Sequence, residues 1–267
     1  MTIAGKSKIE NKKAPTVPIL AASNVTLKFG ATTVLDAVSF TIEAGAFVAV
    51  IGPNGAGKSC LLRCLDRLHD YSGTVSYDGH DINNMSRREL ARVMSYLPQV
   101  VETEIQFSVV EFLAMSRYPW RDMVSQPHAD DVIRDAMERT DIAKFANRQV
   151  STLSGGERQR VLLTADLVQD ADVMLLDEVT TALDPRHQDD ISDLLAAPRK
   201  TAAKTVVIVT HDINRALDAD RIIAMKAGKI VTVATPAEIL ESRMLDELFE
   251  RQFHIVTHPG NGKTMVL

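Results

Sequence analysis

The stretch "FVAVIGPNGAGKS", from Phe47 to Ser59, decides the fold of this chain. It opens with an apolar run of strand length and continues into a turn that matches the phosphate-loop pattern G-x-x-x-x-G-K-[ST] in full. Glycines let backbone N–H groups converge on phosphate oxygens, and the helix that follows adds positive potential at its N-terminus. We expect Lys58 to reach the β- and γ-phosphates and Ser59 to bind Mg²⁺. The predicted nucleotide contacts in this loop are Gly52, Pro53, Asn54, Gly55, Ala56, Gly57, Lys58 and Ser59.

A second motif, "VMLLDE", ends an apolar strand with two carboxylates. Ligands of open α/β sheets bind at the carboxyl ends of strands. We therefore predict that Asp177 holds Mg²⁺ and that Glu178 polarises the water that attacks the γ-phosphate. Many buried strands end in acidic residues, so this pattern indicates a nucleotide site only because a phosphate loop lies upstream.

A third motif, "LSGGERQR" at residues 153–160, opens a predicted helix about a hundred residues after the phosphate loop. Ser154 and Glu157 have the spacing of a capping box, as do the serine and glutamate of "SRREL" and "SVVEF" elsewhere in the chain. Capping explains that pair but not Gly155 and Gly156. Backbone N–H groups and a helix dipole at such a start favour a bound anion. The chain therefore carries two potential phosphate sites that are distant in sequence.

Strand and helix patterns alternate through most of the chain. "VTLKF" and "VSFTI", within residues 19–50, alternate apolar and polar residues at period two, whereas residues 101–150 carry helical patterns that include "HADDVIRDAMERTDIAKF". The alternation predicts an α/β fold with a mixed, mainly parallel sheet and an added β-subdomain. We expect an inserted helical subdomain at about 101–165 and a short hairpin at about 251–267.

Composition narrows the class of protein. The chain has 267 residues, 45 % of them hydrophobic, which is enough for a sizeable core. The net charge is −5 and no lysine/arginine stripe is interleaved with aromatics, so we expect no nucleic-acid partner. No apolar run approaches the roughly 20 residues that span a bilayer, so we expect a soluble chain. Residues 1–18 are predicted to be a disordered basic tail ahead of one domain at 19–267, and Cys60 and Cys64 to be packed thiols of a reducing compartment.

Together the three motifs resemble those of the nucleotide-binding subunits of ABC transporters, and the resemblance covers nearly the whole chain beyond residue 18. In that family two cassettes dimerise head to tail, and each ATP lies between the phosphate loop of one copy and the signature motif of the other. The resemblance implies an ATPase that uses ATP and Mg²⁺ and has a second copy of itself as a partner. It also implies that Ser154, Gly155 and Gly156 bind the ATP of that second copy.

Other positions match the family's motifs one by one. Gln99 in "YLPQ" matches the glutamine that senses Mg²⁺ and couples to the membrane subunit, and His211 in "VTHD" matches the histidine that contacts the γ-phosphate. Asp184 in "ALD" matches the loop that crosses the dimer interface, although Asp184 before Pro185 also fits a helix N-cap. Phe29 in "KFG" matches the aromatic residue that stacks on adenine, with a packed strand phenylalanine as the alternative. The resemblance assigns catalysis to Glu178, His211 and Gln99, and Mg²⁺ binding to Ser59, Gln99 and Asp177.

The chain departs from the family pattern at three places. Cys60 stands in the nucleotide-binding set where threonine is usual, and a thiol is a weaker donor than a hydroxyl, so we expect a modest loss of nucleotide affinity. Val179 replaces the usual proline after the catalytic glutamate and is expected to loosen the turn. Ala165 and Asp166 replace an arginine–alanine pair, and the pattern offers no reason for an aspartate at a position that is normally small.

A finer resemblance concerns the kind of transporter. A single cassette without a fused membrane domain is typical of bacterial importers. "RYPW", at residues 117–120, is similar to the "GRYPH" stretch of cassettes that serve ferric-siderophore, haem and cobalamin importers, although it also fits a helix end broken by proline. The closing "FHIVTHPGNGKTMVL" resembles their C-terminal strand pair. We therefore predict a peripheral subunit at the cytoplasmic face of the inner membrane. It would power uptake of an iron complex, a ferric siderophore before haem or cobalamin, through a separate permease served by a substrate-binding protein.

Two other classes remain open from the sequence. A soluble ABC ATPase that drives assembly, as in iron–sulfur cluster biogenesis, would carry the same ATP motifs. A regulatory module that has lost hydrolysis is disfavoured by the intact Glu178 and His211. The cassette of this family does not touch the cargo, so its sequence holds no direct information about the transported molecule.

Overall fold

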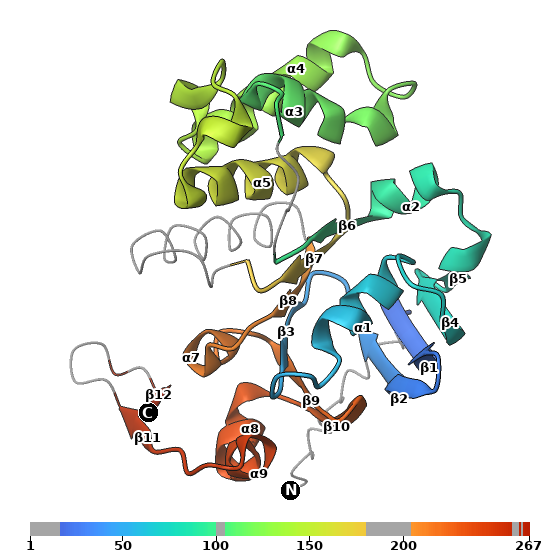
Figure 1. Cartoon of the computed structure of the whole chain (residues 1–267), viewed down its shortest axis with the longest axis vertical. Helices are drawn as coiled ribbons and strands as arrows, with labels where there is room; N and C mark the ends of the chain where they lie inside the picture. Colours follow the sequence, from blue (N-terminus) through green and yellow to red (C-terminus); the bar gives the residue numbers. More distant parts are fainter. Residues whose placement is uncertain (1–16, 100–104, 180–203, 258–261, 263) are drawn as a thin grey trace, which may run out of the picture.

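The centre of the protein, described by a computed structural model, is a six-stranded sheet in the order β10-β9-β3-β8-β7-β6 (Figure 1). The structure describes residues 17–99, 105–179, 204–257, 262 and 264–267. Neighbouring strands run parallel except for β10, which pairs antiparallel with β9. Strands buried on both faces are predominantly apolar, which explains the apolar runs "VMLL" of β7 and "VVIV" of β8. The strands are β3 (Phe47–Ile51), β6 (Met94–Leu97), β7 (Val173–Asp177), β8 (Thr205–Val209), β9 (Arg221–Lys226) and β10 (Lys229–Ala234).

A second, four-stranded antiparallel sheet forms the predicted β-subdomain in the order β2-β1-β4-β5. Alternation in the sequence is matched by alternation in burial, since Val25 and Leu27 of β1 are buried while their neighbours are more exposed. Gly30 turns the chain between β1 and β2 with a φ of 59°, in the left-handed region that suits glycine. The strands are β1 (Leu20–Phe29), β2 (Thr32–Ile42), β4 (Ser72–Tyr77) and β5 (His80–Asp81).

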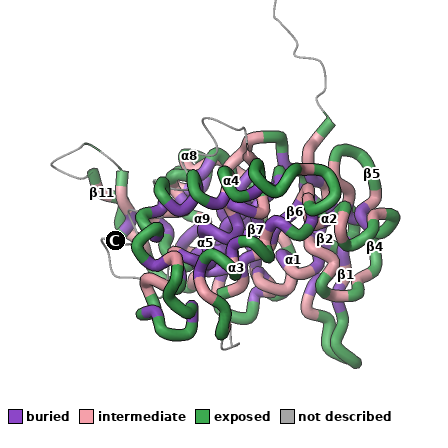
Figure 2. Tube along the Cα trace, turned by 90° about the horizontal axis from the view of Figure 1, so that it is seen from above, coloured by how far each residue is buried: buried purple, intermediate pink, exposed green. Residues whose placement is uncertain are grey.

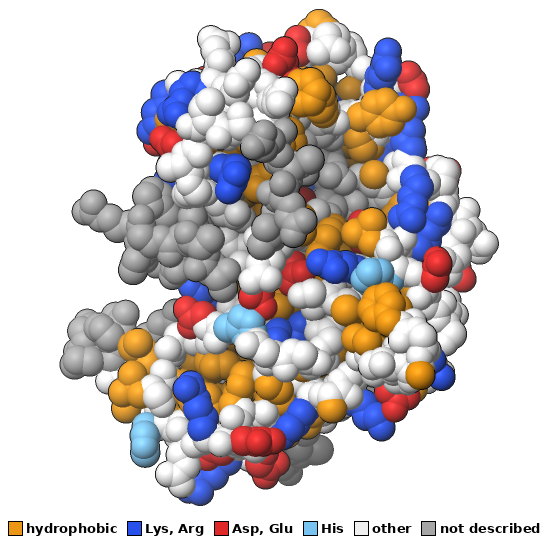
Figure 3. Space-filling model, in the orientation of Figure 1, with side chains coloured by type: hydrophobic (Ala, Val, Ile, Leu, Met, Phe, Trp, Pro, Cys, Tyr) orange, Lys and Arg blue, Asp and Glu red, His pale blue; other side chains and the backbone are white. Residues whose placement is uncertain are grey.

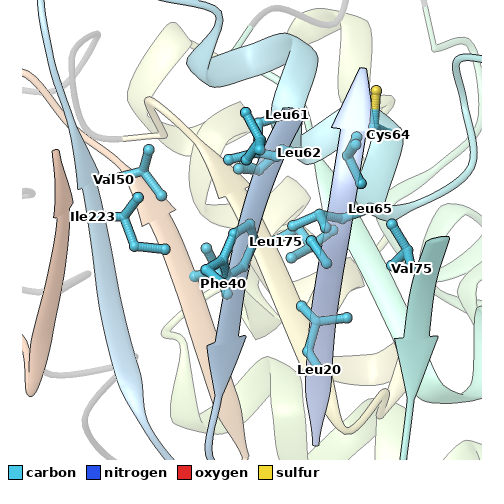
Figure 4. Packing of buried hydrophobic residues seen from close by; sticks show 14 of the residues in the cluster. Leu20, Phe40, Val50, Leu61, Leu62, Cys64, Leu65, Val75, Leu175 and Ile223 are labelled. Atoms are coloured by element: carbon cyan, nitrogen blue, oxygen red, sulfur yellow. The ribbon is translucent and has the colours of Figure 1, made fainter. Parts of the chain in front are cut away.

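Helix α1 (Lys58–Leu65) joins the two sheets into one core. Leu61 and Leu65 are fully buried and share a cluster with Phe40 of β2 and Leu175 of β7. Figure 4 shows side chains of α1, of the antiparallel sheet and of the parallel sheet meeting in this cluster. The helix that opens with the phosphate loop is therefore anchored by apolar packing on both sides.

Between β6 and β7 the described chain is helical, in the region predicted as a helical subdomain. Helices α3 (Val109–Ser116), α4 (Gln126–Arg139) and α5 (Gly155–Gln169) pack around an apolar cluster of their own that includes Leu113 and Ile133. Figure 1 shows them at one end of the molecule, and Figure 2 shows buried residues along α5 and an exposed outer side of α4. Capping boxes at Ser86, Ser108 and Ser154 begin α2 (Arg87–Val93), α3 and α5, as the sequence predicted.

The helical sequence pattern of residues 128–145 predicted a helix that continues further than α4 does. The helix ends at Arg139 because the Thr140 hydroxyl donates to the Ala136 carbonyl at 2.7 Å and Asp141 takes a φ of 53°. A separate 3₁₀ turn, Ala143–Phe145, follows. The apolar periodicity continued across the break because Phe145 is buried in the same cluster as α4.

The C-terminal part contains the β9–β10 hairpin, two short helices and a final strand pair within the region predicted as a short hairpin. A turn at Ala227 and Gly228 joins β9 to β10. Among the described residues, no helix is long and apolar enough to cross a membrane. The remaining elements are α7 (Ile213–Ala216), α8 (Pro236–Glu241), α9 (Met244–Phe249), β11 (Ile255–Thr257) and β12 (Thr264–Val266).

The "RYPW" segment fastens α5 to the rest of the fold. Arg117 is buried, donates to the Val168 carbonyl at 2.9 Å and lies over the Trp120 ring, whose indole N–H donates to the Gln169 carbonyl at 2.7 Å. The Pro119 carbonyl accepts hydrogen bonds from two arginines of α2. Tyr118–Trp120 is a 3₁₀ turn with proline near its start, directly after α3, which fits the alternative of a helix end broken by proline.

We predict that Arg117→Ala lowers the free energy of unfolding by about 1.5–3 kcal/mol, because it removes a buried charged donor and leaves the Val168 carbonyl unpaired. Urea denaturation followed by circular dichroism measures the change. The control is Arg121→Ala, an exposed arginine four residues away, which should stay within about 0.5 kcal/mol of the wild type. Equal midpoints for the two variants would contradict the anchoring role of Arg117.

Candidate nucleotide site

The phosphate loop connects β3 to α1 with the backbone geometry its glycines permit. A Cβ atom added at Gly52 would lie 2.1 Å from the Met225 carbonyl oxygen, and Gly57 has a φ of 95°, so both positions require glycine. Lys58 is buried and its ammonium donates to the carbonyls of Gly52 at 2.9 Å and Pro53 at 3.0 Å. Burial lowers the pKa of Lys58, and the nearby carboxylates partly oppose this shift. These hydrogen bonds hold the Lys58 ammonium over the loop, where a bound phosphate would lie.

A chain of hydrogen bonds links the start of α1 to the end of β7. The Ser59 hydroxyl donates to Asp177 Oδ1 at 2.8 Å, and the Tyr96 hydroxyl donates to Asp177 Oδ2 at 3.1 Å. Arg63 Nε in turn donates to the Tyr96 oxygen at 3.1 Å. Sequence reasoning placed Ser59 and Asp177 but missed Tyr96 and Arg63. The only signal for them was that Tyr96 lies on the strand "SYLPQ" and Arg63 one turn along the helix from Ser59.

The Glu178 carboxylate is fixed from two sides. Gln99 Nε2 donates to its Oε2 at 2.7 Å, and His211 Nε2 lies 2.5 Å from its Oε1. Its own backbone has a φ of 52°, uncommon for a residue other than glycine, and its N–H donates to the Val209 carbonyl. Glu178 is only 9 % exposed. Three segments far apart in sequence therefore meet at one carboxylate.

Val179, which stands where the family usually has proline, is buried in an apolar cluster with residues of the parallel sheet. Its side chain anchors the residue that follows the carboxylate.

Phe29 ends β1 beside the phosphate-loop helix. Its side chain is 52 % exposed and meets His69 edge to face, with ring centroids 5.3 Å apart. Half of the ring is open, so the alternative of a packed strand phenylalanine does not describe it. His69, which the sequence analysis did not single out, has its pKa lowered by burial and by Arg63. An open aromatic face on this side of the loop suits a stacked base.

The structure does not bring Ser154 and its two glycines to the phosphate loop of the same chain. They begin α5 in the helical subdomain, apart from α1 (Figure 1). The Ser154 N–H donates to Glu157 at 2.8 Å and the Glu157 N–H to the Ser154 hydroxyl at 3.4 Å, which completes the capping box. A Cβ atom added at Gly155 would meet nothing within 4 Å, so this start of the helix is open. Asp184, assigned to the dimer interface, lies outside the described residues.

Comparison with known proteins agrees with this geometry. A sequence profile of the ABC transporter family matches residues 35–181. The hemin import ATP-binding protein HmuV of Nocardia farcinica is 39 % identical over 88 % of this chain and 82 % of its own length, and the petrobactin import ATP-binding protein FpuD of Bacillus anthracis is 35 % identical over 93 % and 92 %. The ferric enterobactin transport ATP-binding protein FepC of Escherichia coli is 36 % identical over 93 % of both chains' lengths.

Solved structures show the same fold. A metal-chelate type ABC transporter in an inward-facing conformation matches 94 % of this chain and 97 % of its own with a TM-score of 0.78, at 24 % identity. A dimeric ATP-binding cassette with ADP and phosphate bound matches 81 % of this chain and 98 % of its own, with a TM-score of 0.73 and 28 % identity. This chain belongs to the ABC transporter family. It is an ATP-binding subunit of that family and an ATPase, as the sequence predicted.

The two cysteines, including Cys60 at the position where the family usually has threonine, lie in the phosphate-loop helix α1. Cys60 is half-buried beside Ser59, and burial raises the pKa of its thiol although Arg63 partly opposes this. Cys64 is buried in the core, and burial raises its pKa to about 12. Both thiols are free, as predicted.

We predict that iodoacetamide labels Cys60 slowly at pH 7 and faster as the pH rises to 9, because the thiolate is the nucleophile and its fraction grows about tenfold per pH unit below the pKa. Cys64 should stay unlabelled until the chain unfolds. Peptide mass spectrometry after timed labelling measures both sites, and Cys60→Ser confirms the assignment. Rapid labelling of Cys60 at pH 7 would contradict the raised pKa.

Proposed function

We propose that this chain powers the uptake of an iron complex, a ferric siderophore or haem, by hydrolysing ATP for a separate membrane permease. The observation that carries the enzymatic part is the Glu178 carboxylate held by Gln99 and His211 at the sheet edge where the phosphate loop begins. The cargo class rests on the relatives, which are named for import of hemin, petrobactin and ferric enterobactin.

The proposed roles of the site residues follow from their positions. Lys58 neutralises the β- and γ-phosphates, and Phe29 stacks on the adenine. Glu178 accepts the proton of the attacking water, because it follows the strand that ends in Asp177 and lies near Lys58, where a γ-phosphate bound to the loop would be close. His211 orients that carboxylate and contacts the γ-phosphate. His211 Nε2 lies 2.5 Å from Glu178 Oε1, so both side chains would act at the same place beside the γ-phosphate.

Mg²⁺ fits the oxygen atoms at the start of α1 and the end of β7. Ser59 and Asp177 present oxygens 2.8 Å apart, and hard cations of this kind prefer oxygen ligands. Gln99 supplies an amide oxygen near the same edge. We propose that these three residues hold the ion, which would neutralise charge on the phosphates when bound. Tyr96 and Arg63 then orient Asp177 through their hydrogen bonds.

We further propose that two copies of the chain close head to tail over two ATP molecules. The open helix start at Ser154 and Gly155 lies apart from the phosphate loop of its own chain, so a second copy is needed to bring the two together. The dimeric cassette structure with ADP and phosphate bound supports this arrangement. Asp184 is proposed to cross the resulting interface.

The permease is proposed to dock in a groove between β6 and the helical subdomain. This groove has a volume of about 660 Å³ and begins at Pro98, next to Gln99. Phe107 and Met115 are about half exposed on it. Figure 3 shows hydrophobic and cationic side chains adjoining over the helical subdomain and α2 on the upper right of this face. The apolar lining includes Leu97, Pro98, Ile105, Phe107, Phe112 and Met115.

Docking of this kind would hold the chain at the cytoplasmic face of the inner membrane, with a substrate-binding protein acting on the permease from the other side. A soluble assembly ATPase is not favoured, because the relatives reported above are named for import or transport. Loss of hydrolysis is not favoured either, because Glu178 and His211 are in contact.

We predict that Glu178→Gln binds ATP normally but hydrolyses it at least about a hundredfold more slowly, since it removes a general base. The variant should accumulate as a closed dimer with ATP and Mg²⁺, as seen by light scattering after gel filtration. Glu241→Gln, a change at an exposed glutamate of α8, is the control and should keep wild-type turnover. Turnover of Glu178→Gln within a few-fold of wild type would remove Glu178 from the reaction.

A pull-down from detergent-solubilised membranes of the host tests the transport assignment. We expect the tagged chain to retain a polytopic permease that mass spectrometry identifies. Proteoliposomes containing that complex should show ATPase activity stimulated by the cognate binding protein loaded with a ferric siderophore or haem. A soluble scaffold as the sole partner would overturn the transport assignment and leave the ATP site intact.

A further inference from the structure

The ring of Phe29 lies at a part of its own sheet that offers it little packing. Phe29 is the last residue of β1, and residues 28–33, which include the turn at Gly30, are all exposed. A ring that is free to turn is a poor platform for a base, because ordering it on binding costs conformational entropy. The orientation of the Phe29 ring therefore depends on a contact from outside the strand.

His69 makes that contact. The two ring centroids lie 5.3 Å apart at an interplanar angle of 84°, which is the edge-to-face arrangement that aromatic pairs favour. His69 is half-buried, and its Nε2 has no hydrogen-bond partner among the residues that the structure describes. Within that part of the chain, the packing against Phe29 is thus the specific contact of the imidazole ring.

The end of α1 brings His69 to this place. The Leu68 N–H donates to the Arg63 carbonyl at 2.7 Å. The Arg67 N–H donates to the Cys64 carbonyl at 3.0 Å, and Arg67 itself has a φ of 55°. These two hydrogen bonds and the left-handed residue form a Schellman motif, which ends the helix and turns the chain back. The residue that follows the motif, His69, is thereby returned to the side of Arg63 and of the end of β1.

The surroundings of His69 favour the neutral imidazole. Burial and the charge of Arg63 lower the pKa of His69, and Asp70 partly opposes this shift. Arg63 is itself fixed, because its Nε donates to the Tyr96 oxygen at 3.1 Å. The usual pKa of histidine is about 6.5, so His69 is uncharged at pH 7. A neutral ring packs against phenylalanine without the desolvation cost of a buried imidazolium.

We propose that His69 is a positioning residue for the nucleotide base, which holds the Phe29 ring so that its exposed part receives the adenine. The inference rests on the proposed stacking of adenine on Phe29. His69 acts through the Phe29 ring and does not itself contact the base. Its contribution would therefore strengthen the binding of nucleotides and leave the contacts between the phosphate loop and the phosphates unchanged.

Isothermal titration calorimetry of the purified chain with two probes separates the base from the phosphates. MgATP engages both parts of the site, whereas the Mg²⁺ complex of ribose 5-triphosphate lacks the base. We expect His69→Ala to weaken MgATP binding about threefold to tenfold, the range of an edge-to-face pair, and to leave the binding of ribose 5-triphosphate unchanged. His69→Phe keeps an aromatic ring and should restore the affinity for MgATP. The control is His80→Ala, at an exposed histidine of β5, which should bind both probes as the wild type does.

A double-mutant cycle then connects the effect to Phe29. Phe29→Ala should weaken MgATP binding about tenfold. His69→Ala should add no further loss in that background, because the ring that it positions is gone.

The outcomes separate this inference from the proposed function. Weak MgATP binding by Phe29→Ala beside wild-type binding by His69→Ala would overturn the inference and leave the stacking role of Phe29 in place. Equal losses for both probes in His69→Ala would show a general structural role and would also overturn it. Wild-type MgATP binding by Phe29→Ala would remove Phe29 from the base site, and with it both the inference and that part of the proposed function.

Discussion

The parallel register of β3, β6, β7 and β8 is the constraint on which the rest of the protein depends. Parallel neighbours end at the same edge of a sheet, so whatever follows each strand is brought to that edge. The phosphate loop follows β3, Gln99 follows β6, Asp177 and Glu178 end β7, and His211 follows β8. These groups are distant from one another in sequence, and they meet because the strands that carry them are parallel neighbours. The parallel pairing of the strands places them together.

Residues with strong local signals were predictable from the sequence. The phosphate loop, the strand that ends in Asp177 and the three capping boxes each depend on a few neighbouring residues, and the structure places the corresponding elements where the patterns put them. The antiparallel sheet was predictable because one of its faces is buried and the other is not. The α/β fold followed from the alternation of such segments.

The features that could not be predicted from the sequence depend on contacts between segments that are far apart along the chain. The sequence marked Tyr96 only as a residue of a short strand, whereas in the structure its hydroxyl lies 3.1 Å from Asp177, 81 positions away. The end of α4 was missed because Thr140 and Asp141 break the helix without breaking its apolar periodicity. The burial of Val179 among residues of the parallel sheet could not be predicted from its neighbours in sequence.

The hydrogen bonds of the "RYPW" segment hold α5 at its C-terminal end, and this has a mechanical consequence. Arg117 and Trp120 hold the carbonyls of Val168 and Gln169, at the C-terminal end of the helix, whereas its first residues, Ser154 and Gly155, are open. Fifteen residues at 1.5 Å each make a rigid lever of about 22 Å. A rotation of roughly 10° about the fastened end would carry the open end through about 4 Å, which is more than the length of a hydrogen bond. A small tilt of the helical subdomain is therefore enough to make or lose contact at the signature residues.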